Sequence, residues 1–186
     1  YTARSGDNHM MVQLHRVRLN GRDDERLTDP ALNHRVEVSP DGKFFVDVEQ
    51  AHDRAPMTRL FDFNGKLIAP VAASDLNRFN QLGLSNAELF TFTAADGKTQ
   101  LHGLLQFPSN FDPSKTYPML VSVYGGPTSN GLSEAFATPN ALSEFGFLIL
   151  RVNARTNAGQ GRKVADQAYQ QLGVVEVDDI AARAAA

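Results

Sequence analysis

The chain has no cysteine, and this absence excludes several chemistries. A disulfide framework, a cysteine-ligated zinc site and a thiol nucleophile all need that residue. Long apolar runs are also missing. A membrane-spanning helix needs about 20 apolar residues, whereas the longest run here, residues 145–150, has the length of a strand. Hydrophobic residues make up 42% of the 186, which is enough to bury a sizeable core in one or two domains.

The chain also lacks a large excess of positive or negative charge. Lysine and arginine number 18 against 21 aspartate and glutamate, which gives a net charge of -3. Nucleic-acid-binding surfaces are usually strongly basic, so no nucleic-acid partner is expected. No cofactor is predicted either.

The five histidines show no spacing typical of a metal site. Neither HxxxH nor HExxH occurs, and we interpret all five as ordinary strand or loop residues. No metal site is therefore predicted. The histidines are His9, His15, His34, His52 and His102.

Residues 1–75 are typical of an antiparallel β-meander. Three turn dipeptides of the kind that favours hairpins, Asn20-Gly21, Asp41-Gly42 and Asn64-Gly65, separate short alternating stretches. No helical period interrupts them. This pattern predicts an all-β region of the type that builds sandwiches or propeller blades.

The pattern changes after a polar connector, residues 76–87. A further hairpin is expected around Asp96-Gly97, followed by buried strands over 119–124 and 147–152. Helices are predicted over 133–145, 163–172 and 176–186. Alternating strands and helices indicate an α/β region over 88–186. The predicted fold class is thus all-β plus α/β.

The tetrapeptide Tyr124-Gly125-Gly126-Pro127 is the most informative motif. It follows a predicted buried strand, and ligands of open α/β sheets bind at the carboxyl ends of strands. Glycines would let the backbone turn tightly and approach a bound group. From spacing alone, an ordinary strand exit with a core tyrosine is the simpler interpretation.

Residues 115–127, with tyrosine before Gly-Gly-Pro, resemble the start of the catalytic domain of the prolyl oligopeptidase family, in its dipeptidyl peptidase IV-like branch. Residues 151–161 resemble the arginine-containing segment of that family, and 172–179 its Leu-Gly and Glu-Val-x-Asp stretch. Leu27-Thr28-Asp29 and residues 39–43 are similar to its propeller blades.

The resemblance implies the end of a β-propeller over 1–75 and the truncated start of an α/β-hydrolase domain over 88–186. The family uses a serine, aspartate and histidine in that chain order. No Gly-x-Ser-x-Gly occurs here, and no histidine follows His102. The resemblance therefore places the triad in a remainder of the parent chain, and the 186 residues alone are expected to be inactive.

The resemblance also assigns roles to four residues. Tyr124 would donate its hydroxyl to the oxyanion, and Gly125 and Gly126 would shape its turn. Arg155, Gly125 and Gly126 would bind the substrate or shape a neighbouring loop. However, Asn153 stands where aspartate is usual and Thr156-Asn157-Ala158 replaces Gly-Ser/Thr, so a surface arginine is the equal alternative. The acidic cluster Glu176, Asp178 and Asp179 is interpreted as charge at a helix N-terminus.

The function implied is that of a serine exopeptidase that removes dipeptides, after proline or alanine, with a peptide as its substrate. A periplasmic or secreted location is expected, with a cytoplasmic one as the alternative, and a homodimer is a candidate assembly. Two other functions stay open. One is an acylaminoacyl-peptidase or oligopeptidase relative, and the other is a non-catalytic β-repeat binding module.

Overall fold

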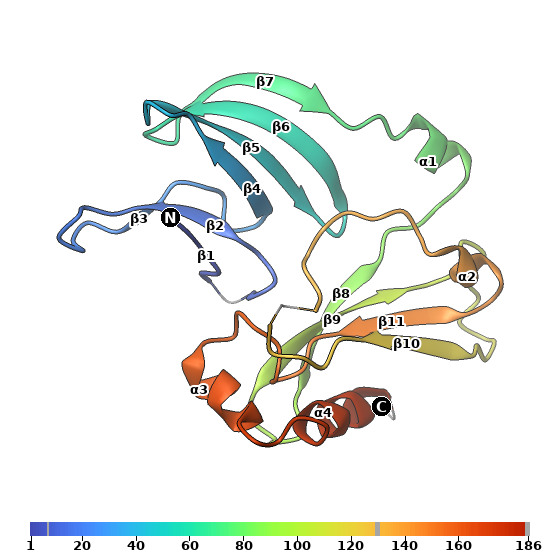
Figure 1. The fold of residues 1–186 in the computed structure, drawn as a ribbon. Helices are drawn as coiled ribbons and strands as arrows, with labels where there is room; N and C mark the ends of the chain where they lie inside the picture. The colour runs from blue at the N-terminus through green and yellow to red at the C-terminus, as the bar shows by residue number, and fades with distance from the viewer. Residues whose placement is uncertain (7, 129–130, 185–186) are drawn as a thin grey trace. The chain divides into compact units, whose positions relative to one another are not determined.

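The computed structural model describes residues 1–6, 8–128 and 131–184, which form two compact units (Figure 1). The first unit contains Tyr1–Asn80 and Glu134–Ala137, and the second contains Gln81–Ser133 and Thr138–Ala186. The segment Glu134–Ala137 therefore packs with strands that lie far earlier in the chain. No helix within the described ranges is long and apolar enough to cross a membrane.

The first unit is built from strands, as predicted. A four-stranded antiparallel sheet has the order β4-β5-β6-β7, and a smaller sheet has the order β1-β2-β3. Glycines with positive φ occupy the expected turns, at Gly21, Gly42 and Gly65. The bounds are β1 Thr2–Ala3, β2 Gln13–Arg16, β3 Glu25–Arg26, β4 Asn33–Val38, β5 Phe44–Ala51, β6 Arg54–Asp62 and β7 Leu67–Ala73, followed by helix α1 Asn77–Gln81.

Strand β5 shows why this sheet has one inner face. Its buried residues alternate, as a strand with one covered face requires: Phe45, Asp47, Glu49 and Ala51. The ring of Phe45 stacks on Phe61 of β6 at a centroid distance of 5.1 Å. Two of the four inward residues are acidic, so this face carries polar partners as well as apolar ones.

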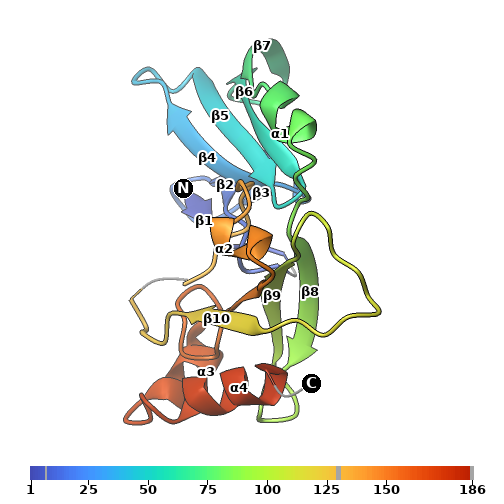
Figure 2. The same ribbon diagram turned by 90° about the vertical axis from the view of Figure 1, so that its right-hand side faces the viewer.

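The second unit contains a mixed four-stranded sheet of order β10-β11-β9-β8. Strands β10 and β11 are parallel, and the other pairs are antiparallel. Helices α3 and α4 lie on the same side of β10 (Figure 2). The bounds are β8 Glu88–Thr93, β9 Gln100–Gln106, β10 Met119–Val123, α2 Ala141–Glu144, β11 Leu148–Val152, α3 Arg162–Ala165, the 3-10 helix η1 Asp166–Ala168 and α4 Val175–Ala184.

Two helix predictions are wrong in extent. Over 133–145 only α2 forms, because Pro139 disfavours helix at the residue before it and Asn140 caps the helix that follows by accepting the Leu142 N–H. Over 163–172 the helical region ends at Ala168, and Gln170 has a φ of 56°, which no α-helix accommodates. The third predicted helix is confirmed as α4 over the described residues.

The predicted cover of β10 is also wrong for the described residues. Strand β10 lies at the edge of its sheet and pairs with β11. Its apolar side chains are therefore 36–48% exposed: Met119, Leu120, Val121 and Val123. The apolar run identified a strand correctly, but its second neighbour does not lie among the residues that the structure describes.

Candidate functional site

Tyr124 follows the last residue of β10 and is 39% exposed. Its hydroxyl oxygen lies 2.5 Å from the hydroxyl oxygen of Thr128. Glycines flank the side chain. A Cβ added at Gly126 would lie 2.7 Å from the phenol oxygen, and one added at Gly131 would lie 2.7 Å from the Tyr124 Cβ. Both positions therefore need glycine to leave room for the tyrosine.

Gly125 makes a different close approach. An added Cβ would lie 2.9 Å from Cγ of Glu176 in the first turn of α4. The buried Glu176 carboxylate also accepts the N–H of Gly173, at 2.6 Å. The two glycines of the motif thus allow close packing of protein side chains, and they fix the turn against α4 and the tyrosine ring.

Asn157 holds the backbone of this turn and was missed as a functional candidate. Its Nδ2 donates to the carbonyl oxygen of Tyr124 at 2.6 Å and to that of Gly126 at 3.3 Å. Its Oδ1 accepts the N–H of Ala154 at 2.7 Å, and the side chain is fully buried. In the sequence, Asn157 is a departure from the pattern of the resembling family. The only signal was an amide two residues after an arginine, which by itself specifies nothing.

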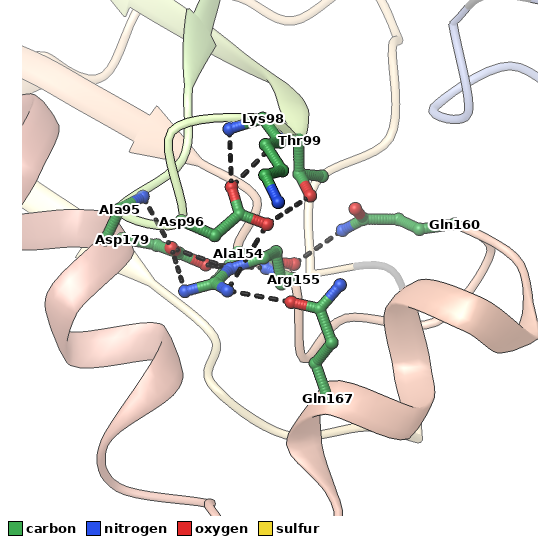
Figure 3. Close-up of polar contacts among 9 residues, drawn as sticks. All are labelled: Ala95, Asp96, Lys98, Thr99, Ala154, Arg155, Gln160, Gln167 and Asp179. Carbon is green, nitrogen blue, oxygen red and sulfur yellow. Dashed lines mark hydrogen bonds and ion pairs between the residues drawn. The ribbon is translucent and has the colours of Figure 1, made fainter.

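Arg155 is 8% exposed, so the interpretation of a surface arginine is wrong. Its Nε lies 2.9 and 3.0 Å from the two carboxylate oxygens of Asp179, and Nη2 lies 2.9 Å from Oδ1 (Figure 3). Nη1 donates to Gln167 at 2.8 Å and lies 3.5 Å from Asp96. Arg155 thus joins α4, η1 and the β8–β9 turn.

Asp179 is the buried centre of this network. It has no exposed surface, and it also accepts the N–H groups of Ala95 and Arg155, each at 3.0 Å. The interpretation of the acidic cluster as simple helix N-terminal charge is therefore wrong for Asp179. Glu176 accepts a nearby N–H, whereas Asp178 is exposed.

The network shifts the pKa values of two members in opposite directions. The hydrogen bond with Asp179 raises the pKa of Arg155 despite the opposing effect of burial. Burial raises the pKa of Asp96, but other contacts outweigh this effect and lower the pKa to about 2. These contacts are hydrogen bonds from the Thr99 hydroxyl and from the N–H groups of Thr99 and Lys98, and the positive charge of Arg155. Arg155 and Asp96 therefore both carry their charges at neutral pH.

A buried trio in the first unit, His34, Asp47 and Glu49, has the residue types of a metal site. However, the Nδ1 of His34 contacts Asp47 at 2.6 Å and its Nε2 contacts the carbonyl oxygen of Asp29 at 2.8 Å. Glu49 pairs with Arg59 at 3.0 Å. Both ring nitrogens are engaged and a carbonyl can only accept, so the trio is a hydrogen-bond network and not an open ligand set.

A second arrangement in the first unit has the atom pattern of a catalytic triad. The hydroxyl of Ser5 lies 2.7 Å from Nε2 of His15, whose Nδ1 lies 3.0 Å from Asp24. Ser5 follows the two-residue strand β1, however, and is not on a strand-to-helix elbow. Asp24 is about half exposed, and Tyr1 also donates to it. We interpret this chain of contacts as a tie between β1, β2 and the β2–β3 turn.

No protein-family model matches the chain. It is 43% identical to mouse (Mus musculus) prolyl endopeptidase FAP over 75 residues, which cover 39% of this chain and 10% of that protein. It is 25% identical to human (Homo sapiens) dipeptidyl peptidase 8 over 166 residues, covering 83% and 18%. A crystal structure assigned as a dipeptidyl aminopeptidase IV from Bacteroides ovatus superimposes with a TM-score of 0.74 at 25% identity, covering 83% of this chain and 23% of that one.

These relatives define a class of peptidase. The homologues are named dipeptidyl peptidases and a prolyl endopeptidase, and the sheet-rich fold is compatible with a propeller-type region. These similarities fit a fragment of the dipeptidyl peptidase IV-like branch of the prolyl oligopeptidase family, as the residues around Tyr124 predict. It spans 10–18% of the length of the two curated relatives described.

Proposed function

We propose that these residues are part of a serine exopeptidase that removes dipeptides from peptide N-termini after proline or alanine. Tyr124 supplies one of two donors to the oxyanion that forms when a serine attacks the scissile carbonyl. The observation that carries this proposal is the exposed phenol at the end of β10, enclosed by Gly126 and Gly131. A donor held in place stabilises developing negative charge without having to reorganise.

The contact with Thr128 bears on this role. Either hydroxyl can donate in that hydrogen bond. In the proposed transition state, Thr128 would donate to the phenol oxygen while the phenol O–H of Tyr124 donates to the oxyanion. A hydrogen bond received by the phenol oxygen also polarises the O–H group. Thr128 would thus support the tyrosine without contacting the reacting atoms.

In this proposal the chain spans the junction of two domains. Residues 1–75 form the end of a propeller, 76–87 a connector and 88–186 the start of an α/β-hydrolase domain. The exposed apolar edge at β10 supports the assignment, because an unpaired apolar strand is usually covered by another strand in a stable protein. The remainder of the parent chain would supply that strand, the serine and the histidine.

Arg155 would support the site indirectly, by holding together the segments that pack against the turn after Tyr124. Its guanidinium contacts Asp179, Gln167 and Asp96, so it joins three segments of the second unit. One of these segments is α4, whose Glu176 packs on Gly125. In this way the arginine supports the turn that follows Tyr124.

One specific observation favours a second function, that of an endopeptidase. The stretch of 43% identity is to a protein named prolyl endopeptidase. The two activities differ in their need for a free substrate amine. An exopeptidase that releases dipeptides binds that amine, whereas an endopeptidase tolerates a blocked one.

The test is hydrolysis by the full-length protein of Gly-Pro and Ala-Pro chromogenic substrates, with the same compounds N-acetylated. We expect turnover of the free forms, loss of at least about 100-fold with the blocked forms, and inactivation by an organophosphorus serine reagent. Equal turnover of the blocked forms would assign the endopeptidase instead.

The variant Ser5→Ala is the matched control for the nucleophile. It should keep full activity, because the contact from Ser5 to His15 is interpreted as structural. Abolished turnover in Ser5→Ala would place the nucleophile in the first unit and overturn the proposal.

A further inference from the structure

Two asparagines follow strand β11 and are fully buried, Asn153 and Asn157. Asn153 pairs with the main chain of Leu132 at two points. Its Oδ1 accepts the Leu132 N–H at 2.8 Å, and its Nδ2 donates to the Leu132 carbonyl oxygen at 3.0 Å. The side-chain amide thus imitates a neighbouring strand and fixes the main chain at Leu132.

Asn157 makes the corresponding contacts on the other side of the tyrosine. Its Nδ2 reaches the carbonyl oxygens of Tyr124 and Gly126, while Oδ1 is held by the Ala154 N–H. Gly131, the residue before Leu132, packs on the Tyr124 Cβ, and Gly126 packs on the phenol. The two amides therefore hold both segments that enclose the tyrosine side chain.

We propose that Asn153 and Asn157 are positioning residues that form a two-point amide clamp on the phenol of Tyr124. This inference rests on the proposed function, since it names the residues that orient the oxyanion donor. Neither asparagine contacts the reacting atoms. Both act through the main chain on either side of the tyrosine.

The chemistry of the contacts explains why both residues are amides. Each side chain must donate to a carbonyl oxygen and accept an N–H at the same time, which asparagine does and an ionised aspartate cannot. A carboxylate at Asn157 would face the carbonyl oxygens of Tyr124 and Gly126 in a buried setting. Both positions are among those at which this chain departs from the resembling family's pattern.

The experiment uses Asn153→Ala and Asn157→Asp in the full-length protein, with Asn140→Asp as the matched control. Asn140 caps α2 by accepting the Leu142 N–H, and aspartate is an equally good cap. We expect kcat with Gly-Pro substrates to fall about 10- to 100-fold in the two clamp variants. KM should change less than about twofold, and the control should match the wild type.

A double-mutant cycle separates positioning from general loss of structure. In a Tyr124→Phe background, Asn157→Asp should lower kcat by less than about threefold, because the group that it orients is already missing. Full additivity of the two losses would overturn the clamp. So would a loss of kcat in Asn140→Asp equal to that of the clamp variants.

Amide hydrogen exchange tests the clamp without turnover. Peptides covering Tyr124 and Leu132 should exchange at least about tenfold faster in the clamp variants than in the control. Unchanged exchange overturns the clamp even in an active enzyme. Faster exchange in a protein without peptidase activity would sustain the clamp and reject the proposed function. If the Asn157→Asp variant fails to fold, Asn157→Ala carries the same measurements without a buried charge.

Discussion

Asp179→Asn tests how far the second unit depends on one buried carboxylate. The substitution is nearly isosteric but removes the negative charge that faces the guanidinium of Arg155. It also places an NH2 group among donors, because Asp179 accepts from Ala95, the main chain of Arg155 and the guanidinium.

The magnitude follows from burial. Asp179 is 0% and Arg155 8% exposed, and Asp96, at 3.5 Å, is the other carboxylate paired with the arginine. Removing one partner of a buried pair costs about 3–5 kcal/mol, and here the remaining charge keeps only the longer contact to Asp96. For a domain of roughly 150–250 residues, this corresponds to a fall in Tm of about 6–20 °C.

The assay is thermal unfolding of the full-length protein followed by circular dichroism, with Asp178→Asn as control. Asp178 is the exposed neighbour on the same helix turn, so its loss should change stability by no more than about 0.5 kcal/mol. If both variants shift Tm equally, the buried ion pair contributes no specific stability and the reasoning is refuted.

Three further predictions concern the turn, the pH dependence and the isolated chain. Gly126→Ala should fold with a Tm near that of the wild type but lose about tenfold or more in kcat, because the added Cβ would lie 2.7 Å from the phenol oxygen of Tyr124 and displace it. An unchanged kcat would show that activity does not depend on the position of this phenol. The pKa of Asp96 is lowered from 3.8 to about 2, so its carboxylate stabilises the folded state above pH 3.8 and that contribution disappears as the pH falls through about 2. Urea midpoints of wild type and Asp96→Asn should therefore differ at pH 7 and converge near pH 2, and a constant difference would contradict the assigned pKa. Residues 1–186 expressed alone should neither hydrolyse Gly-Pro substrates nor unfold cooperatively, because the exposed β10 edge needs a neighbour; a soluble monomer with a sharp transition would disprove this.

Local chemistry explains what the sequence predicted well. Gly42, Gly65 and Gly97 adopt positive φ at the predicted turns, because that preference belongs to the dipeptide itself. The apolar runs over β10 and β11 likewise predicted these two strands correctly. Tyr124 was identified through its motif, and the structure places it at the end of a strand as predicted.

Contacts distant in sequence explain what was missed. The predicted helix over 133–145 failed because Glu134 instead bonds to the first unit, where its main chain joins Met10 and Asn33 and its carboxylate joins His52. Helical spacing cannot reveal such partners. Likewise, no local pattern pairs Arg155 with Asp179, 24 residues later.

The central claim is that the hydroxyl of Tyr124 stabilises the oxyanion, and Tyr124→Phe in the full-length protein tests it most directly. Tyr117→Phe is the matched control, because the Tyr117 hydroxyl accepts the N–H of Asp112 before β10. With a Gly-Pro substrate, Tyr124→Phe should lower kcat by about 10²–10³ with KM nearly unchanged, the usual loss for one oxyanion donor. Tyr117→Phe should retain most of the activity. Full kcat in Tyr124→Phe would contradict the account and leave Tyr124 as a packing residue at the end of β10.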